Sequence, residues 1–201
     1  MTLMKYPQIK AKFLTGSEAI TDSNSGEIAK LIDFWSWAYS DLIGNTERGA
    51  LAEYIVACAL GIQKNEKISW SKYDLLSPEG ISIEVKTSGY IQTWEQDKPS
   101  ALVFGIQPTY GWDEKTNTYD DAKKRQADIY VFCVHKHLEQ ETINPLDIKQ
   151  WDFYILPTKI LNEKVGNQKK ISLNSLLKIG AKKSEFENLH EMIMNLYNNI
   201  S

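Results

Sequence analysis

Several residue types that mark a particular class of protein are scarce in this 201-residue chain. Two cysteines and three histidines are too few for a disulfide framework, and their placement does not suggest a zinc site. No apolar run is long enough to span a membrane, and the N-terminal residues lack the apolar core of a secretion signal. A net charge of −3 argues against a protein that binds nucleic acid through overall positive charge. We therefore expect a cytoplasmic protein with free thiols and no membrane contact.

The composition is otherwise that of an ordinary folded domain. Hydrophobic residues make up 42% of the chain, with six tryptophans and ten tyrosines, which is enough for a substantial core. We expect one domain over residues 1–201, with its core in about residues 27–157. Residues 158–201 are expected to add a basic segment and a final helix.

The spacing of apolar residues predicts the order of the elements. An amphipathic helix is expected to end near Ile43, with an apolar stripe formed by Ile28, Leu31, Ile32, Trp35, Tyr39 and Leu42. Later apolar runs are expected to form buried strands over residues 101–107, 129–134 and 151–157. A capping box, Ser184-x-x-Glu187, is expected to open the last helix. This order suits an α/β sandwich with a mixed central sheet.

The segment from Asp74 to Lys86 predicts a tight β-hairpin that gathers charged side chains on one face. Residues 81–86 alternate apolar and polar, the pattern of a half-buried strand. The sequence Pro78-Glu79-Gly80 suits a three-residue loop with glycine in the left-handed region. That loop places Asp74 opposite Glu84, and directly opposed residues share a face of the sheet. Lys86, two residues after Glu84, lies on the same face.

Two facing carboxylates repel each other, so a purely structural sheet would avoid this pair. A divalent cation removes the conflict, because Mg²⁺ prefers oxygen ligands. Lys86 could then hold a phosphate oxygen or an attacking water. The plainer alternative is an exposed strand on which Lys86 pairs with one of the acids, an interaction worth about 0–1 kcal/mol.

A second carboxylate stands out in the helical segment between Gly49 and Gly61. Glu53 is the one charged residue there, and apolar side chains surround it on nearly all sides. A buried carboxylate costs several kcal/mol unless it is paired, protonated or bound to a metal. The alternative is a partnership with Arg48, although five residues is not a favourable spacing on a helix.

Together these residues resemble the PD-(D/E)xK nuclease superfamily, which has the restriction-endonuclease-like fold. Members carry an acid on the first core helix, an aspartate near a hairpin, and (D/E)-x-K on the next strand. Here Glu53, Asp74 and Glu84-Val85-Lys86 follow that order. The resemblance covers about residues 45–90, under a quarter of the chain, and tyrosine replaces the proline before Asp74.

The resemblance implies a three-layer α/β sandwich, with a mixed central β-sheet flanked by helices, and a metal-dependent deoxyribonuclease. Glu53, Asp74 and Glu84 would hold Mg²⁺, or Mn²⁺ in its place, together with the Val85 carbonyl. Lys86 would position the attacking water or stabilise developing charge. The implied reaction hydrolyses DNA phosphodiester bonds and leaves 5′-phosphates, in restriction, defence or repair.

Positive charge is unevenly distributed along the chain. From Lys159 to Lys183 there are seven lysines and one acid, a run that suits either DNA contact or ordinary solvated surface. We expect Lys123, Lys124 and Arg125 to contact DNA. Ser88 is expected to do so as well, because Thr87-Ser88 after the motif lysine is similar to resolvase-like and Mrr-like members.

Two other functions stay open at this point. One is a catalytically silent nucleic-acid-binding module of the same fold, although degenerate members usually lose one of the four site residues and this chain retains all of them. A glycosidase is the weaker alternative, because opposed strand residues lie too close for its usual carboxyl separation. Cutting both strands of a duplex would need a homodimer or successive nicks.

Overall fold

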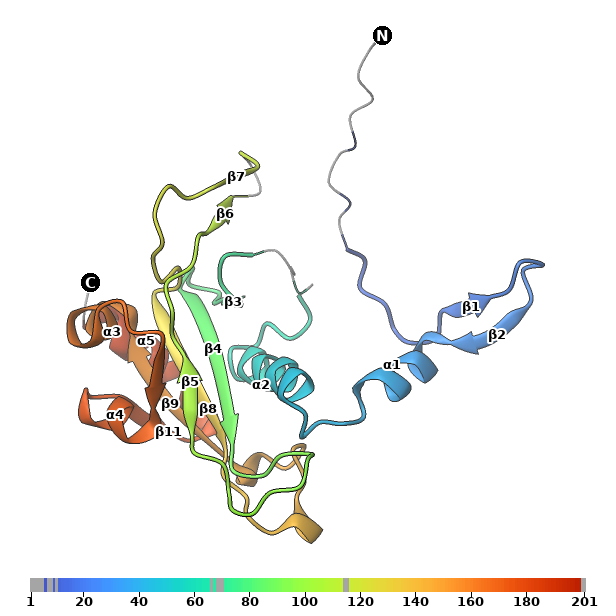
Figure 1. Ribbon diagram of the computed structural model, residues 1–201. Helices are drawn as coiled ribbons and strands as arrows, with labels where there is room; N and C mark the ends of the chain where they lie inside the picture. Colours follow the sequence, from blue (N-terminus) through green and yellow to red (C-terminus); the bar gives the residue numbers. More distant parts are fainter. Residues whose placement is uncertain are drawn as a thin grey trace.

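A five-stranded mixed sheet forms the middle layer of the molecule (Figure 1). The structure is a computed structural model that describes residues 6, 9, 11–65, 67, 71–113 and 116–199. From one edge to the other, the strands are β11 (Lys182–Ser184), β9 (Trp151–Pro157), β8 (Ile129–His135), β4 (Ser82–Gly89) and β3 (Leu75–Leu76). Strands β4 and β8 are parallel, and the other neighbours are antiparallel. All seven residues of β8 are buried, as expected for a strand covered on both faces.

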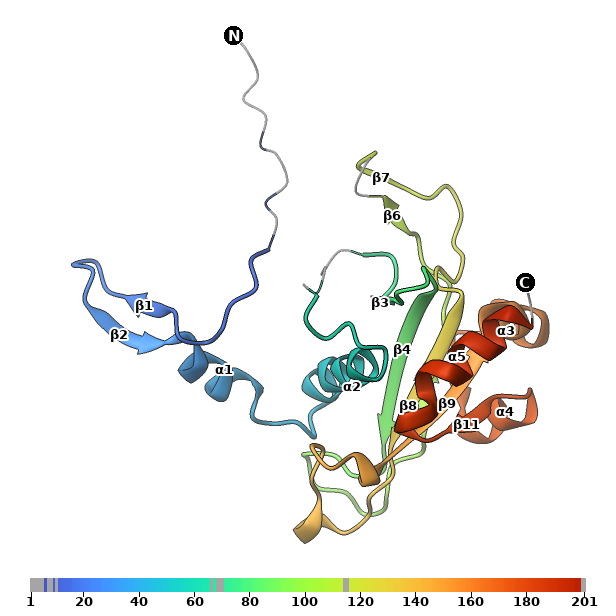
Figure 2. The same cartoon turned by 180° about the vertical axis from the view of Figure 1, so that it is seen from behind.

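Helices cover both faces of this sheet, which confirms the predicted three-layer α/β fold. Helices α2 (Asn45–Ala59) and α5 (Leu189–Asn198) pack on one face. The other face is covered by α3 (Thr158–Val165), α4 (Leu173–Lys178) and a two-stranded sheet of β5 (Val103–Gly105) and β10 (Lys170–Ser172). Figure 2 shows the molecule from behind, with α2 and α5 in view. No helix among the described residues is both long and apolar enough to cross a membrane.

The predicted hairpin register is confirmed. The Ser77 amide donates to the Ile81 carbonyl at 2.9 Å, and Leu75 pairs with Ile83 across β3 and β4. Asp74 directly precedes β3, and its amide donates to the Ile83 carbonyl at 3.1 Å. Gly80 has a φ of +86°, the left-handed conformation that the three-residue loop requires.

The N-terminal segment differs from the predicted long helix. Strands β1 (Ala19–Thr21) and β2 (Glu27–Lys30) form a hairpin, and α1 (Leu31–Tyr39) begins only after it. The Asp22 carboxylate accepts the amides of Asn24 and Gly26 at 2.8 Å, which closes the turn between β1 and β2. The ββα arm, residues 15–39, extends away from the three layers (Figures 1 and 2), and α1 has no buried residue.

The C-terminal part is richer in structure than predicted. The hydrophobic clusters on the two sheet faces draw on residues from Ala52 to Ile193, so α5 is part of the core and residues 27–43 are not. The Ser184 capping box is wrong, because Ser184 ends β11 and α5 begins at Leu189 after a 3₁₀ turn. The remaining short elements are β6 (Trp112–Asp113), β7 (Thr118–Tyr119), and 3₁₀ turns at Gln140–Thr142, Ile148–Gln150 and Phe186–Asn188.

Candidate active site

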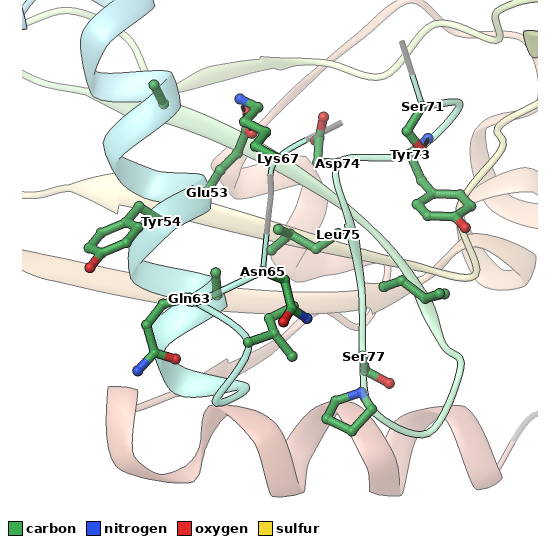
Figure 3. Close-up of a pocket in the computed structure, with 15 residues that line it drawn as sticks. Glu53, Tyr54, Gln63, Asn65, Lys67, Ser71, Tyr73, Asp74, Leu75 and Ser77 are labelled. Carbon is green, nitrogen blue, oxygen red and sulfur yellow. Dashed lines mark hydrogen bonds and ion pairs between the residues drawn. The ribbon is translucent and has the colours of Figure 1, made fainter. Parts of the chain in front are cut away.

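Helix α2 places Glu53 beside the β3–β4 hairpin (Figure 3). Its side chain is 18% exposed, and the Lys67 ammonium lies 2.5 Å from Oε2. Glu53 Oε2 has no hydrogen bond of regular geometry among the described residues. Arg48 is not its partner, because the Arg48 guanidinium donates to the Ile43 carbonyl and to the Asn45 and Gln92 side-chain oxygens. The ion pair that the sequence offered as an alternative for Glu53 is therefore absent.

Asp74 is fixed to the edge of β4. Its Oδ2 accepts the backbone amide of Val85 at 2.7 Å, just before β3 begins at Leu75. The N–H and C=O of one strand residue point to the same edge, so the Val85 carbonyl is directed toward the Asp74 side as well. An acid and a backbone carbonyl thus lie together at this edge of the sheet.

Glu84 and Lys86 project from β4 on the face opposite Ile83 and Val85, as the alternation predicted. The Lys86 ammonium donates to Glu84 Oε1, and the two side chains are 31% and 20% exposed. Tyr130 on β8 is the strand partner of Glu84. Burial and the charge of Glu84 raise the pKa of the Tyr130 phenol, so Tyr130 stays neutral and can act as a hydrogen-bond donor.

The three carboxylates are close enough to affect one another's protonation. Burial raises the pKa of Glu84, and the charges of Asp74 and Glu53 raise it further, while Lys86 lowers it. Burial likewise raises the pKa of Glu53, which Lys67 lowers and Asp74 raises. Each glutamate is thus influenced both by Asp74 and by a neighbouring lysine.

Cavities on both sides of the sheet edge reach these side chains. A cavity of about 550 Å³ between α2 and the hairpin is lined by Glu53, Lys67 and Asp74 (Figure 3). A cavity of about 300 Å³ is lined by both Asp74 and Glu84. A third, of about 360 Å³, is lined by Glu84 and Lys86. The carboxylates are therefore accessible to a ligand from more than one direction.

The residues present fit a hard divalent cation. Three carboxylates and one carbonyl supply oxygen donors only, which is the set that Mg²⁺ prefers. Glu53 Oε2 is buried and lies against the Lys67 ammonium without a regular hydrogen bond, so a bound metal ion would supply the partner that this oxygen lacks. Among the described residues, no three acidic, histidine or cysteine groups already stand in metal-binding geometry, and lysine ammonium groups lie on Glu53 and Glu84.

The four residues predicted to contact DNA divide into two pairs. Ser88 is buried, and its Oγ accepts the Val103 amide at 3.3 Å. Arg125 is also buried and donates to carbonyl and side-chain oxygens. Both residues therefore have structural contacts in place of the predicted DNA contacts. Ser88 lies within strand β4, and the polar segment that carries Arg125 turns inward at that residue. Lys123 and Lys124 are exposed, with Lys124 paired to Asp120 at 3.4 Å.

Sequence reasoning missed other groups near Glu84 and Lys86. The cavity of about 360 Å³ also contains Gln126, Tyr130, Lys169 and Lys170. The two lysines belong to the basic C-terminal run, but nothing in their spacing separates them from the other lysines of that run. The Gln126-x-x-x-Tyr130 spacing is similar to a motif of RecB-like nucleases, but that motif lies on a helix and Tyr130 lies on strand β8, so the spacing is a weak signal for the other pair.

The family model of bacteriophage T4 endonuclease IV matches residues 10–175, most of the chain. The chain belongs to the bacteriophage T4 endonuclease IV family. No individual curated protein matches it. The family match includes the whole Glu53, Asp74, Glu84 and Lys86 constellation. The chain is therefore a member of an endonuclease family with a three-layer α/β fold.

Proposed function

We propose that this member of the bacteriophage T4 endonuclease IV family is a Mg²⁺-dependent endonuclease that hydrolyses DNA phosphodiester bonds. The supporting observation is that Asp74, bonded to the Val85 amide, lines one cavity with Glu53 and another with Glu84, which in turn pairs with Lys86. Their order and strand positions are those of the PD-(D/E)xK nucleases, to which we assign this site.

Asp74, Glu84 and the Val85 carbonyl would hold the cation, with Glu53 completing the site from α2. When bound, such a cation polarises the scissile phosphate and lowers the pKa of a coordinated water. Mn²⁺ has the same preference for oxygen donors and would serve in place of Mg²⁺.

The lysines have a separate task in this proposal. Lys86 stands at the Glu84 carboxylate, within reach of a phosphate bound there, and its ammonium donates to a phosphate oxygen as negative charge develops. A positioned donor of this kind is typically worth about 10²–10³-fold in rate. Lys67 neutralises Glu53 and would leave it when a cation takes over that carboxylate.

A catalytically silent DNA-binding module is the second candidate, and one observation favours it. The ammonium groups of Lys67 and Lys86 already lie on Glu53 and Glu84, which neutralises part of the site without any metal. In that case Lys67 and Lys86 would be permanent partners of the acids, and DNA would bind without being cut.

Cleavage of plasmid, single-stranded and branched DNA, each with Mg²⁺ and with EDTA, distinguishes the two candidates. We expect strand breaks with 5′-phosphate ends in Mg²⁺ alone, and their loss in Glu84→Gln. Glu163→Gln is the matched control, because Glu163 is an exposed glutamate on α3 away from the site. Binding without cleavage in every metal would favour the silent module. Roles in restriction, defence or repair and assembly as a homodimer stay predictions of the resemblance.

A further inference from the structure

Two lysines from a distant part of the chain lie beside the proposed catalytic residues. Lys169 and Lys170 line the same cavity of about 360 Å³ as Glu84 and Lys86. A long stretch of sequence separates these lysines from Lys86, so it is the fold that brings them together. It brings additional positive charge to the place where a phosphate would be held.

Strand pairing determines where Lys170 points. Strand β10 pairs with β5 so that Lys170 lies opposite Gly105 and Ile171 opposite Phe104. Ile171 and Phe104 are buried in the core, so the alternating Lys170 faces outward. Gly105 has no side chain, and a Cβ atom there would meet nothing within 4 Å. The cavity is therefore open beside Lys170.

Buried Arg125 fixes the loop that carries Lys169. Its guanidinium donates to the Ile106 carbonyl at 2.7 Å, and to the Gly166 and Gln168 carbonyls at 2.8 and 3.1 Å. The Ile106 amide in turn donates to the Lys169 carbonyl at 2.9 Å. Arg125 therefore acts as a positioning residue that holds the α3–β10 loop against the segment after β5.

Lys169 also lines a neighbouring cavity of about 500 Å³. Gln107, Thr109 and Lys169 line both cavities, and the second one also contains Lys123. The Lys123 ammonium lies 5.2 Å from the centre of the Tyr110 ring. Among the described lining residues of this groove, four are lysines and Glu84 is the acid, so the groove is positively charged despite the negative charge of the whole chain.

We propose that Lys169, Lys170 and Lys123 form a phosphate-binding track for the DNA backbone on one side of the scissile bond. The proposal rests on the function proposed above and names the residues that hold its substrate. The scissile phosphate lies at Glu84 and Lys86, and the adjoining phosphates follow the groove toward Lys123. Lysine contacts of this kind strengthen binding independently of sequence and make it dependent on salt.

The double variant Lys169→Ala/Lys170→Ala tests the track, with Lys164→Ala/Lys178→Ala as the matched control. The control lysines belong to the same basic run but do not line either cavity. We expect the track variant to bind a short fluorescein-labelled DNA about tenfold more weakly, and the slope of log affinity against log salt to fall by about 1 to 2. Single-turnover cleavage at DNA concentrations well below the Kd should fall by about the same factor as the affinity, and the control variant should cleave as wild type does.

Unchanged affinity and salt slope in the track variant, or an equal loss in the control, would overturn the proposal. Thermal unfolding of both variants is the check on folding, and Lys169→Arg/Lys170→Arg should restore binding because arginine keeps the charge. Binding is measured without added metal, so it does not depend on the catalytic assignment. If the wild type binds DNA through these lysines but never cuts it, the track stands and the nuclease proposal fails. If it cuts DNA and the lysine variant binds as well as wild type, the reverse holds.

Discussion

Replacement of Glu53 by glutamine tests whether Glu53 is a metal ligand or a residue that supports the fold. The Glu53 side chain is 18% exposed, and burial raises its pKa, so the ionised form costs stability in the metal-free protein at neutral pH. Glutamine keeps the size of the side chain and removes that cost. It also removes the ion pair with Lys67, whose side chain is 58% exposed, so that the pair contributes at most about 1 kcal/mol. Because the two effects oppose each other, the free energy of unfolding without metal should change by no more than about 1 kcal/mol.

Added Mg²⁺ should distinguish the two proteins. A ligand at one hundred times its Kd stabilises the folded state by about 2.7 kcal/mol, and a tenfold weaker affinity reduces this gain by about 1.3 kcal/mol. We expect wild type and Glu163→Gln to show the full gain in urea unfolding, and Glu53→Gln to lose half of it or more. An equal gain in Glu53→Gln would refute a metal role for this residue. A loss of about 3–5 kcal/mol without metal would instead show that Glu53 neutralises a buried cation.

Three further changes test other parts of the structure. Lys86→Ala should slow cleavage by about 10²–10³-fold at nearly unchanged DNA affinity, and a variant that cuts as fast as wild type would make Lys86 a surface residue. Burial and the nearby charge of Arg48 lower the pKa of His135 from 6.5 to about 4. The folded protein therefore binds the His135 proton less tightly than the unfolded chain does, and it loses stability as the pH falls. In urea unfolding near neutral pH and near pH 4, His135→Phe should remove about 3 kcal/mol of that acid-induced loss, and an unchanged pH dependence would contradict this assignment. Trp37→Ser should leave the free energy of unfolding of the three layers unchanged within about 0.5 kcal/mol, since Trp37 is 84% exposed on the arm. A large decrease would show that the arm packs on the layers.

The hairpin could be predicted from the sequence because several local rules agree there. The loop residues, the left-handed glycine and the alternation of residues 81–86 all specify one register, and a slip by one residue would have sent Asp74 to the other face. Strands β8 and β9 could also be predicted from the sequence, because a continuous apolar run of that length suits a strand buried on both faces.

The misses have physical causes that a local pattern does not contain. The apolar stripe of residues 28–42 predicted a core helix, but apolar spacing alone does not show what covers it, and the Asp22 turn directed part of it into a hairpin. Arg125 was predicted to contact DNA because it belongs to the basic cluster of residues 123–125 and is one of two arginines in the sequence. Its burial depends on the Asn162 side chain of α3 and on carbonyl groups of the α3–β10 loop, which are distant in the sequence, and so does the position of Lys169.

The central claim is that the carboxylates at the sheet edge bind a divalent cation for DNA cleavage. Anomalous diffraction from crystals soaked in Mn²⁺ tests it most directly, because the signal locates the metal without reference to activity. We expect a peak between the Asp74 and Glu84 carboxylates, about 2.0–2.3 Å from their oxygens and from the Val85 carbonyl, and its loss in Glu84→Gln crystals. A soaked crystal of an enzyme that cuts DNA, with no peak there and with Lys67 and Lys86 still on Glu53 and Glu84, would contradict it.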